Sequence, residues 1–196
     1  MDTVNSAKEG GHMRIIAGCA KGTRLHSVQG LSVRPTTDRV KESLFQVIGP
    51  FFSGGFVLDL FAGSGSLGLE ALSRGAERGI FIDQARGSIE AVRRNAKATR
   101  LDKHVEIYQR DARAALRTLK GRGISFQLIF LDPPYKDGVL PEVIQSIDEG
   151  ELLEEDGWLI AEHDKGEALP QEIGKLYIER TLTYGDIQID LYTKES

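Results

Sequence analysis

The feature that most constrains the fold is an alternation of short apolar runs with stretches of helical periodicity, which begins at residue 56. Alternating strands and helices form a parallel sheet with helices on both of its faces. We expect the strands at residues 56–60, 79–82, 105–108, 126–131 and 157–162. The segments between them predict helices at 66–74, at 87–100, from Asp111 onward and at 138–149.

The end of the chain has a different pattern. Residues 176–182 and 187–192 are both typical of strands, and only the turn Tyr184-Gly185-Asp186 lies between them, without a helix. A closing hairpin of this kind implies an antiparallel strand at the sheet edge. The sequence therefore predicts an α/β, Rossmann-like, doubly wound fold with a seven-stranded, mostly parallel sheet and an antiparallel edge strand.

The residues before this alternation divide the chain into three expected parts. Residues 1–12 are polar and aperiodic, and we interpret them as an added, disordered leader before a native start at Met13. Residues 13–36 contain short apolar stretches with turns, which predict a basic N-terminal β-hairpin or arm. Residues 37–196 form the main domain, which opens with a helix capped by Thr37 or Asp38 and ended by Gly49-Pro50.

The net charge of −4 conceals a strong asymmetry along the chain. Residues 13–45 contain six basic and two acidic side chains, whereas residues 137–196 contain four basic and 16 acidic ones. An acidic average argues against indiscriminate binding to nucleic acid, but a basic front end can form a local patch for phosphate groups. The alternative is that these charges only solvate the surface.

Composition excludes several other classes of protein. There is no apolar run of 18 residues and no basic-then-apolar leader, so we expect a cytoplasmic protein without a membrane segment. Cys19 is the single cysteine, which rules out a disulfide framework and a thiolate metal site. His26, His104 and His163 are scattered along the sequence, and we expect no bound metal.

A glycine-rich turn follows the first strand of the alternation. The sequence Val57-Leu58-Asp59-Leu60-Phe61-Ala62-Gly63-Ser64-Gly65-Ser66-Leu67-Gly68 allows tight backbone angles and the close approach of a ligand. Asp83 ends the next apolar run 20 residues after Gly63, where an acid can bind ribose hydroxyls. Asp111 follows the third strand and can accept from an adenine amino group or cap a helix. The glycine spacing also fits a dinucleotide fingerprint.

A second motif, Asp132-Pro133-Pro134-Tyr135, follows the fourth strand directly. The prolines fix their own φ angles and donate no N–H groups, so nearby carbonyls are left to accept from a ligand. A carboxylate, such carbonyls and the flat ring of Tyr135 suit a planar group with an amine, such as the amino edge of a nucleobase. The alternative is a proline turn that only ends the strand.

Taken in this order, the motifs resemble those of class I S-adenosylmethionine-dependent methyltransferases. The front end is more specific: Met13-Arg14-Ile15-Ile16-Ala17-Gly18 and Arg34-Pro35-Thr36-Thr37-Asp38-Arg39-Val40-Lys41-Glu42-Ser43-Leu44-Phe45 are similar to the RsmD family. The resemblance extends over nearly all of residues 13–196. It implies methyl transfer from S-adenosylmethionine to the N2 amine of a guanine in bacterial 16S ribosomal RNA.

The resemblance also implies roles for individual residues. The catalytic residues would be Asp132, Pro133, Pro134 and Tyr135. The residues that bind S-adenosylmethionine and its product S-adenosylhomocysteine would be Asp59, Phe61, Ala62, Gly63, Gly65, Asp83, Gln84, Asp111 and Ala112. Gln84 stands where the family often has a charged residue. The residues that contact RNA phosphates would be Arg14, Lys21, Arg24, Arg34 and Arg39. Arg34 and Arg39 have the alternative role of pairing with Glu42 or Asp38.

The expected partner is ribosomal RNA within a small-subunit particle, bound by a monomer. An aryl amine is a poor nucleophile, and hydrogen bonds from its N–H groups to Asp132 and to the Pro133 carbonyl would favour a pyramidal, reactive nitrogen. Three alternatives are a methyltransferase for adenine or cytosine amines in DNA, a nicotinamide-dependent reductase, and an RNA-binding module without methyl transfer.

Overall fold

The computed structural model describes residues 13–29, 36–134 and 138–194. The expected leader at residues 1–12, Arg34 and Tyr135 all lie outside these ranges.

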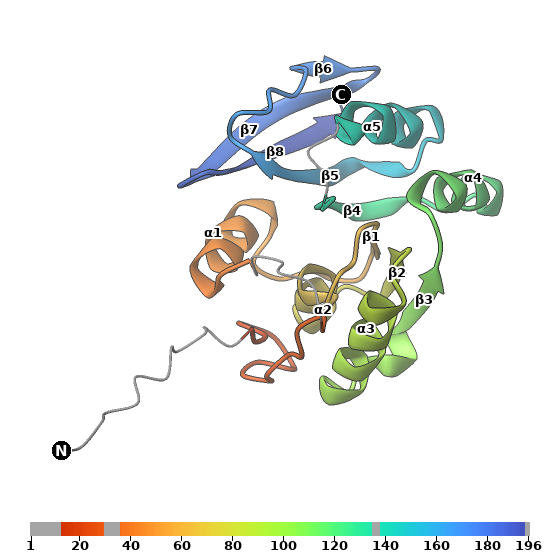
Figure 1. Cartoon of the computed structure of the whole chain (residues 1–196). Coiled ribbons are helices and arrows are strands. Elements are labelled where there is room, and N and C mark those ends of the chain that lie inside the picture. Colours follow the sequence, from red (N-terminus) through yellow and green to blue (C-terminus); the bar gives the residue numbers. More distant parts are fainter. Residues whose placement is uncertain (1–12, 30–35, 135–137, 195–196) are drawn as a thin grey trace.

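The centre of the molecule is one eight-stranded sheet in the order β3-β2-β1-β4-β5-β8-β7-β6 (Figure 1). The first five strands of this order, β3, β2, β1, β4 and β5, pair in parallel. The strands β8, β7 and β6 complete the sheet in antiparallel pairs. The bounds are β1 Phe56–Asp59, β2 Arg78–Asp83, β3 Val105–Gln109, β4 Phe126–Leu131, β5 Leu153–Asp164, β6 Glu172–Ile173, β7 Leu176–Tyr184 and β8 Ile187–Lys194.

The expected mostly parallel sheet is confirmed, but the number of seven strands is wrong. The strand that the sequence did not indicate is β6, which has two residues and pairs with the start of β7. Two residues are too few to show an alternating pattern, so periodicity cannot reveal such a strand. The strand β5 also begins four residues earlier than expected, and its pairing with β4 shifts register between Phe126 and Leu128.

Helices cover both faces of the sheet, each over its own apolar cluster (Figure 1). The helices α1 (Asp38–Ile48), α2 (Ser66–Ser73) and α3 (Arg86–Ala98) pack on one face, where Phe45, Phe81 and Phe130 are fully buried. The helices α4 (Ala112–Arg122) and α5 (Val139–Glu149) pack on the other face. A short 3-10 turn, Asp102–His104, precedes β3. This arrangement is the predicted doubly wound one.

The ends of α1 agree with the sequence. The Thr37 hydroxyl accepts the Val40 N–H at 3.3 Å, so Thr37 is the cap and Asp38 is the first helical residue. At the other end, the Gly49 N–H donates to the Phe45 carbonyl. Gly49 has a φ angle of 134°, which residues with a side chain rarely adopt. Asp38 is therefore free to pair with Arg14, at 2.8 Å.

The predicted N-terminal hairpin is present only as a short antiparallel pairing and not as two regular strands. In the described part of the arm, residues 13–29, an isolated bridge joins Arg14 to Arg24, and backbone hydrogen bonds join Ile15 to Thr23 and Leu25 to Met13. The pairing does not extend further, because side chains of helix α2 accept the next backbone N–H groups of the arm. The Glu70 carboxylate accepts the N–H groups of Ile16, at 2.9 Å, and Ala17, at 3.1 Å, and the Ser73 hydroxyl accepts that of Ala20.

Glu70 also stands at the centre of a buried group of charges. Its carboxylate lies 3.1 Å from the Lys41 ammonium and 2.9 Å from the Arg74 guanidinium, and all three side chains are at most 4% exposed. Burial lowers the pKa of Lys41, while the adjacent Glu70 opposes that shift. Arg74 lies over the Phe45 ring at 4.5 Å. One carboxylate thus joins the arm, α1 and α2.

We expect Glu70→Gln to lower the free energy of unfolding by about 3–5 kcal/mol, because it leaves two buried cations without their counter-charge. Urea denaturation measures this loss. Glu90→Gln is the matched control. It also removes an ion pair with an arginine four residues away, Arg86, but the side chains of Arg86 and Glu90 are both exposed. It should cost under about 0.5 kcal/mol. Equal losses in the two variants would contradict the role given to Glu70.

Candidate functional site

Three acidic side chains gather at the carboxyl edge of the sheet. The strand β1 lies between β2 and β4, all three are parallel, and Asp59 pairs in register with Phe81 and Phe130. Asp83 ends β2, and Asp132 follows β4 directly. Burial raises the pKa of Asp59 well above its usual range, and the negative charges of Asp132 and Asp83 raise it further, against a hydrogen bond from Gly68.

The glycine loop connects β1 to α2 and depends on glycine at three positions. Gly63 and Gly65 have φ angles of 55° and 78°, in the left-handed region that favours glycine. At Gly68 a Cβ would lie 2.5 Å from the Phe81 ring, so only glycine allows α2 to pack this close to β2. A Cβ on Gly63 would meet no heavy atom within 4 Å. The loop is therefore tightly packed on one side and open at Gly63.

Asp59 and Asp83 hold this loop in place. The buried Asp59 carboxylate accepts the Gly68 N–H at 3.2 Å. The two oxygens of Asp83 accept the N–H groups of Gly63, at 2.9 Å, and Ala85, at 2.8 Å. A carboxylate has about four acceptor sites, so Asp83 keeps capacity for two further donors. Both aspartates thus have a structural role, and their predicted role in binding the cofactor stays a prediction.

The ends of β2 and β3 bring the remaining predicted cofactor residues to the same edge. The Arg110 N–H donates to the Asp83 carbonyl at 2.9 Å, and the Gln109 side chain donates to the Gln84 carbonyl at 3.2 Å. Asp111 is exposed and caps α4 by accepting the Ala114 N–H at 3.1 Å, which confirms the helix-cap alternative. Phe61 and Ala112 are half-buried against the apolar cluster of the α4 and α5 face, and Ala62 is buried.

The second motif leaves β4 beside the glycine loop. Asp132 and Pro133 are half-buried and Pro134 is exposed, while the predicted stacking residue Tyr135 lies outside the described residues. Burial raises the pKa of Asp132 to about 6. Because β1 and β4 are parallel neighbours, the glycine loop and this turn open at the same edge of the sheet.

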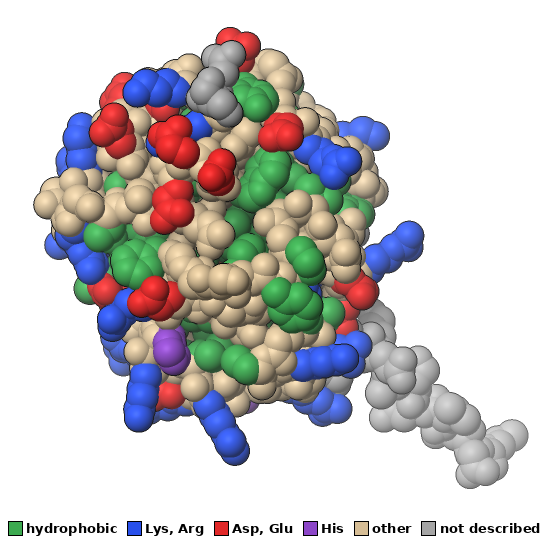
Figure 2. All heavy atoms as spheres, turned by 180° about the vertical axis from the view of Figure 1, so that it is seen from behind, with side chains coloured by type: hydrophobic (Ala, Val, Ile, Leu, Met, Phe, Trp, Pro, Cys, Tyr) green, Lys and Arg blue, Asp and Glu red, His purple; other side chains and the backbone are tan. Residues whose placement is uncertain are grey.

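The basic side chains predicted to contact RNA are distributed over the arm and the start of α1. Arg14, Lys21, Arg24 and Arg39 are exposed, and Arg34 lies outside the described ranges. Asp38 pairs with Arg14, and among the described residues the alternative pairing of Arg39 with Asp38 or Glu42 is not found. On the face seen in Figure 2, acidic side chains gather mainly in the upper part, whereas basic side chains are distributed around the whole rim, including the lower edge.

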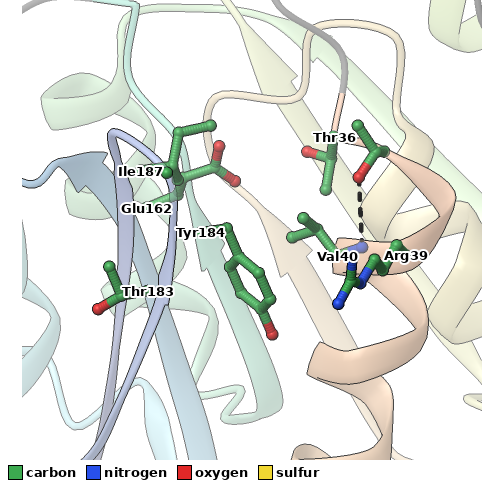
Figure 3. A pocket seen from close by; sticks show the side chains of 9 residues that line it. Thr36, Arg39, Val40, Glu162, Thr183, Tyr184 and Ile187 are labelled. Carbon is green, nitrogen blue, oxygen red and sulfur yellow. Dashed lines mark hydrogen bonds between the residues drawn. The ribbon is translucent and has the colours of Figure 1, made fainter.

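Two features of this edge were not predicted from the sequence. One is Asn95 of α3, fully buried, whose amide nitrogen donates to the carbonyls of Ser64 in the glycine loop, at 2.8 Å, and His26 in the arm, at 2.9 Å. The other is a cavity of about 390 Å³, lined by Thr36, Thr37, Arg39, Val40, Glu162, Thr183, Tyr184, Gly185 and Ile187 (Figure 3). Its walls come from three separate parts of the sequence, so no local pattern indicates it.

Within the part of the chain that the structure describes, no group of three or more histidine, cysteine or acidic side chains is placed to hold a metal ion. No helix within the same ranges is long and apolar enough to cross a membrane.

The doubly wound sheet with a glycine loop at its carboxyl edge defines an α/β protein of the methyltransferase fold. The solved structure of the Escherichia coli protein named "Putative methyltransferase yhhF" matches this fold with a TM-score of 0.81 at 31% identity, over 94% of this chain and 99% of that one.

A family model described as "Conserved hypothetical protein 95" matches residues 13–193. Protein YlbH of Bacillus subtilis is 50% identical over 182 residues, 93% of this chain and 99% of that protein. Ribosomal RNA small subunit methyltransferase D of Escherichia coli is 32% identical over 186 residues, 95% of this chain and 92% of that protein. The chain belongs to this family, the RsmD family, which confirms the resemblance found in the sequence.

We expect Gly68→Ala to destabilise the protein by about 1–3 kcal/mol, because the new methyl group overlaps the Phe81 ring. Urea denaturation tests this expectation. Gly121→Ala in α4 is the matched control, since a Cβ there meets nothing within 4 Å. It should stabilise by about 0.4–1 kcal/mol. If Gly68→Ala and Gly121→Ala changed the free energy of unfolding equally, the close packing of α2 on β2 would not explain the glycine at position 68.

Proposed function

We propose that this protein transfers a methyl group from S-adenosylmethionine to the exocyclic N2 amine of a guanine in 16S ribosomal RNA. The single observation that supports this most is the parallel pairing of β1 with β4, because it sets the glycine loop beside Asp132-Pro133-Pro134. A relative that shares 32% identity is named as a small-subunit ribosomal RNA methyltransferase, which supports the same substrate class. The reaction would take place in the cytoplasm, on a small-subunit particle, with the protein acting as a monomer.

The glycine loop fits a nucleoside-bearing methyl donor. Gly63 leaves open space, and Asp83 is oriented by two N–H groups with acceptor capacity remaining for a pair of ribose hydroxyls. Gln84, Asp111 and Ala112 would border the adenine, and Asp59, Phe61, Ala62 and Gly65 would shape the loop. When bound, S-adenosylmethionine supplies an electrophilic methyl group on a positively charged sulfur.

Asp132 and the carbonyl of Pro133 prepare the amine. Each accepts one N–H of the guanine N2, which localises the nitrogen lone pair and points it toward the methyl carbon beside the glycine loop. Positioning of this kind is worth several kcal/mol of the barrier. Tyr135 would stack on the base, which must leave its own stack to reach the turn.

The proton balance requires no strong base. As the N–C bond forms and the S–C bond breaks, the amine nitrogen becomes a cation and a strong acid. Asp132, or water beside it, accepts the released proton, and its raised pKa suits this step. The products are N2-methylguanine, S-adenosylhomocysteine and one proton.

We expect Asp132→Asn to lower kcat roughly 10²–10³-fold, as the loss of one charged hydrogen-bond partner in a transition state does. The free energy of unfolding at pH 8 should not fall, because the raised pKa shows that the fold disfavours the ionised carboxylate. Methyl transfer to small-subunit particles from cells lacking this gene, together with urea denaturation, measures both quantities. Asp102→Asn, exposed at the opposite edge of the sheet before β3, is the control and should keep full activity. Full activity of Asp132→Asn would remove the proposed role.

We also expect kcat to fall as the pH drops through about 6, the pKa to which burial raises Asp132. Below that pH the carboxyl group is protonated and accepts the amine N–H poorly. A pH–rate profile of methyl transfer tests this point. A rate independent of pH between about 5 and 8 would contradict the expectation.

Two measurements separate the proposal from its alternatives. Calorimetric titration with S-adenosylmethionine and with NADH separates a methyltransferase from a reductase, and only the first compound should bind. Mass spectrometry of nucleosides from 16S ribosomal RNA of cells lacking the gene should show the loss of one N2-methylguanine. An unchanged nucleoside profile would contradict the substrate.

A further inference from the structure

The cavity between α1 and the β7–β8 hairpin has the size of a site for one small molecule. Its volume of about 390 Å³ lies at the lower end of the range of about 300–1,000 Å³ that ligand pockets occupy. One wall consists of Thr36, Thr37, Arg39 and Val40, the hairpin contributes the opposite wall, and Glu162 of β5 borders the cavity (Figure 3).

This cavity opens on the same edge and the same face of the sheet as Asp132. Leu131 of β4 pairs with Ala161 of β5, so Asp132 and Glu162 are the next residues along neighbouring strands. Phe130 and Ile160, two residues earlier, both point into the cluster under α1, and side chains two apart share a face. Glu162 therefore lies between Asp132 and the cavity, and Asp132 does not line it.

The walls combine an aromatic ring with a cation. The ring of Tyr184 extends from the hairpin toward α1, where its hydroxyl donates to the Ser43 hydroxyl, so the ring is held in place (Figure 3). Val40 and Ile187 add apolar surface. Arg39 is exposed, and none of the ion pairs among residues 13–29, 36–134 and 138–194 includes it.

We propose that this cavity binds the nucleotide adjacent to the methylated guanine, with its base on the Tyr184 ring and its phosphate at Arg39; this rests on the proposed function. Single-stranded nucleic acids are held by this combination of aromatic stacking and cationic contacts to the backbone. An enzyme that takes one base out of a stack also has to hold the flanking nucleotides. The position one strand away from Asp132 matches a neighbour in the RNA chain rather than the reacting base.

The test uses two assays with the full chain. The first is methyl transfer to small-subunit particles from cells lacking the gene, analysed as kcat and KM. The second is the Kd of a short fluorescein-labelled single-stranded RNA, measured by anisotropy. Tyr184→Leu should raise KM and Kd about tenfold, as loss of one stacked base does, while kcat and the affinity for S-adenosylmethionine stay unchanged.

Three further variants isolate the cause. Tyr184→Phe keeps the ring and loses only the bond to Ser43, so it should bind RNA like the wild type. Arg39→Gln, an exposed change, should reduce the slope of log Kd against log salt by about one. Tyr108→Leu removes an aromatic side chain that is 45% exposed on β3, outside the cavity, and should change nothing.

The outcomes distinguish the subsite from the proposed function. If the wild type transfers methyl groups and neither Tyr184→Leu nor Arg39→Gln changes the kinetics, the subsite alone is overturned. A Tyr184→Leu variant with a lower kcat and an unchanged KM has the same consequence. A wild type that transfers no methyl group overturns the proposed function, and the Kd values of the RNA then decide the subsite by themselves. A wild type that neither transfers a methyl group nor binds the RNA overturns both.

Discussion

The buried Glu70 carboxylate is the interaction on which the N-terminal half of the structure depends. It accepts the backbone N–H groups of Ile16 and Ala17 and faces the cations Lys41 and Arg74. A buried carboxylate is costly unless its acceptor sites are filled, and here four donors fill them. Through these contacts, the carboxylate of α2 determines where the arm and α1 lie. The basic side chains of the arm are therefore fixed relative to the carboxyl edge.

Local chemistry explains why much of the fold was predictable. Strand–helix alternation, the Thr37 cap and the Gly49 end are set by neighbours in the sequence, and the structure confirms each of them. The grouping of Asp59, Asp83 and Asp132 was also predictable, because the carboxyl ends of parallel strands share one edge. Family membership followed from the front-end motif and is shown by the comparisons.

The features that escaped prediction depend on contacts between distant residues. The arm has the pattern of a hairpin, but only a short part of it pairs with itself. Other backbone N–H groups of the arm donate to Glu70 and Ser73, more than 50 residues away. The available sign of these contacts was a charged residue, Glu70, inside the fully buried helix 66–73. The sequence does not indicate which groups that carboxylate contacts. The Tyr184 cavity likewise joins a hairpin turn to a helix 141 residues earlier. Nor does sequence reveal that Asp83 supports the loop, since that bond runs back 20 residues.

The amide of Asn95 joins two segments that are far apart in the sequence. Because it holds Ser64 of the glycine loop and His26 of the arm at once, the two segments cannot move independently of each other. A contact that orders one of them therefore also reduces the conformational freedom of the other.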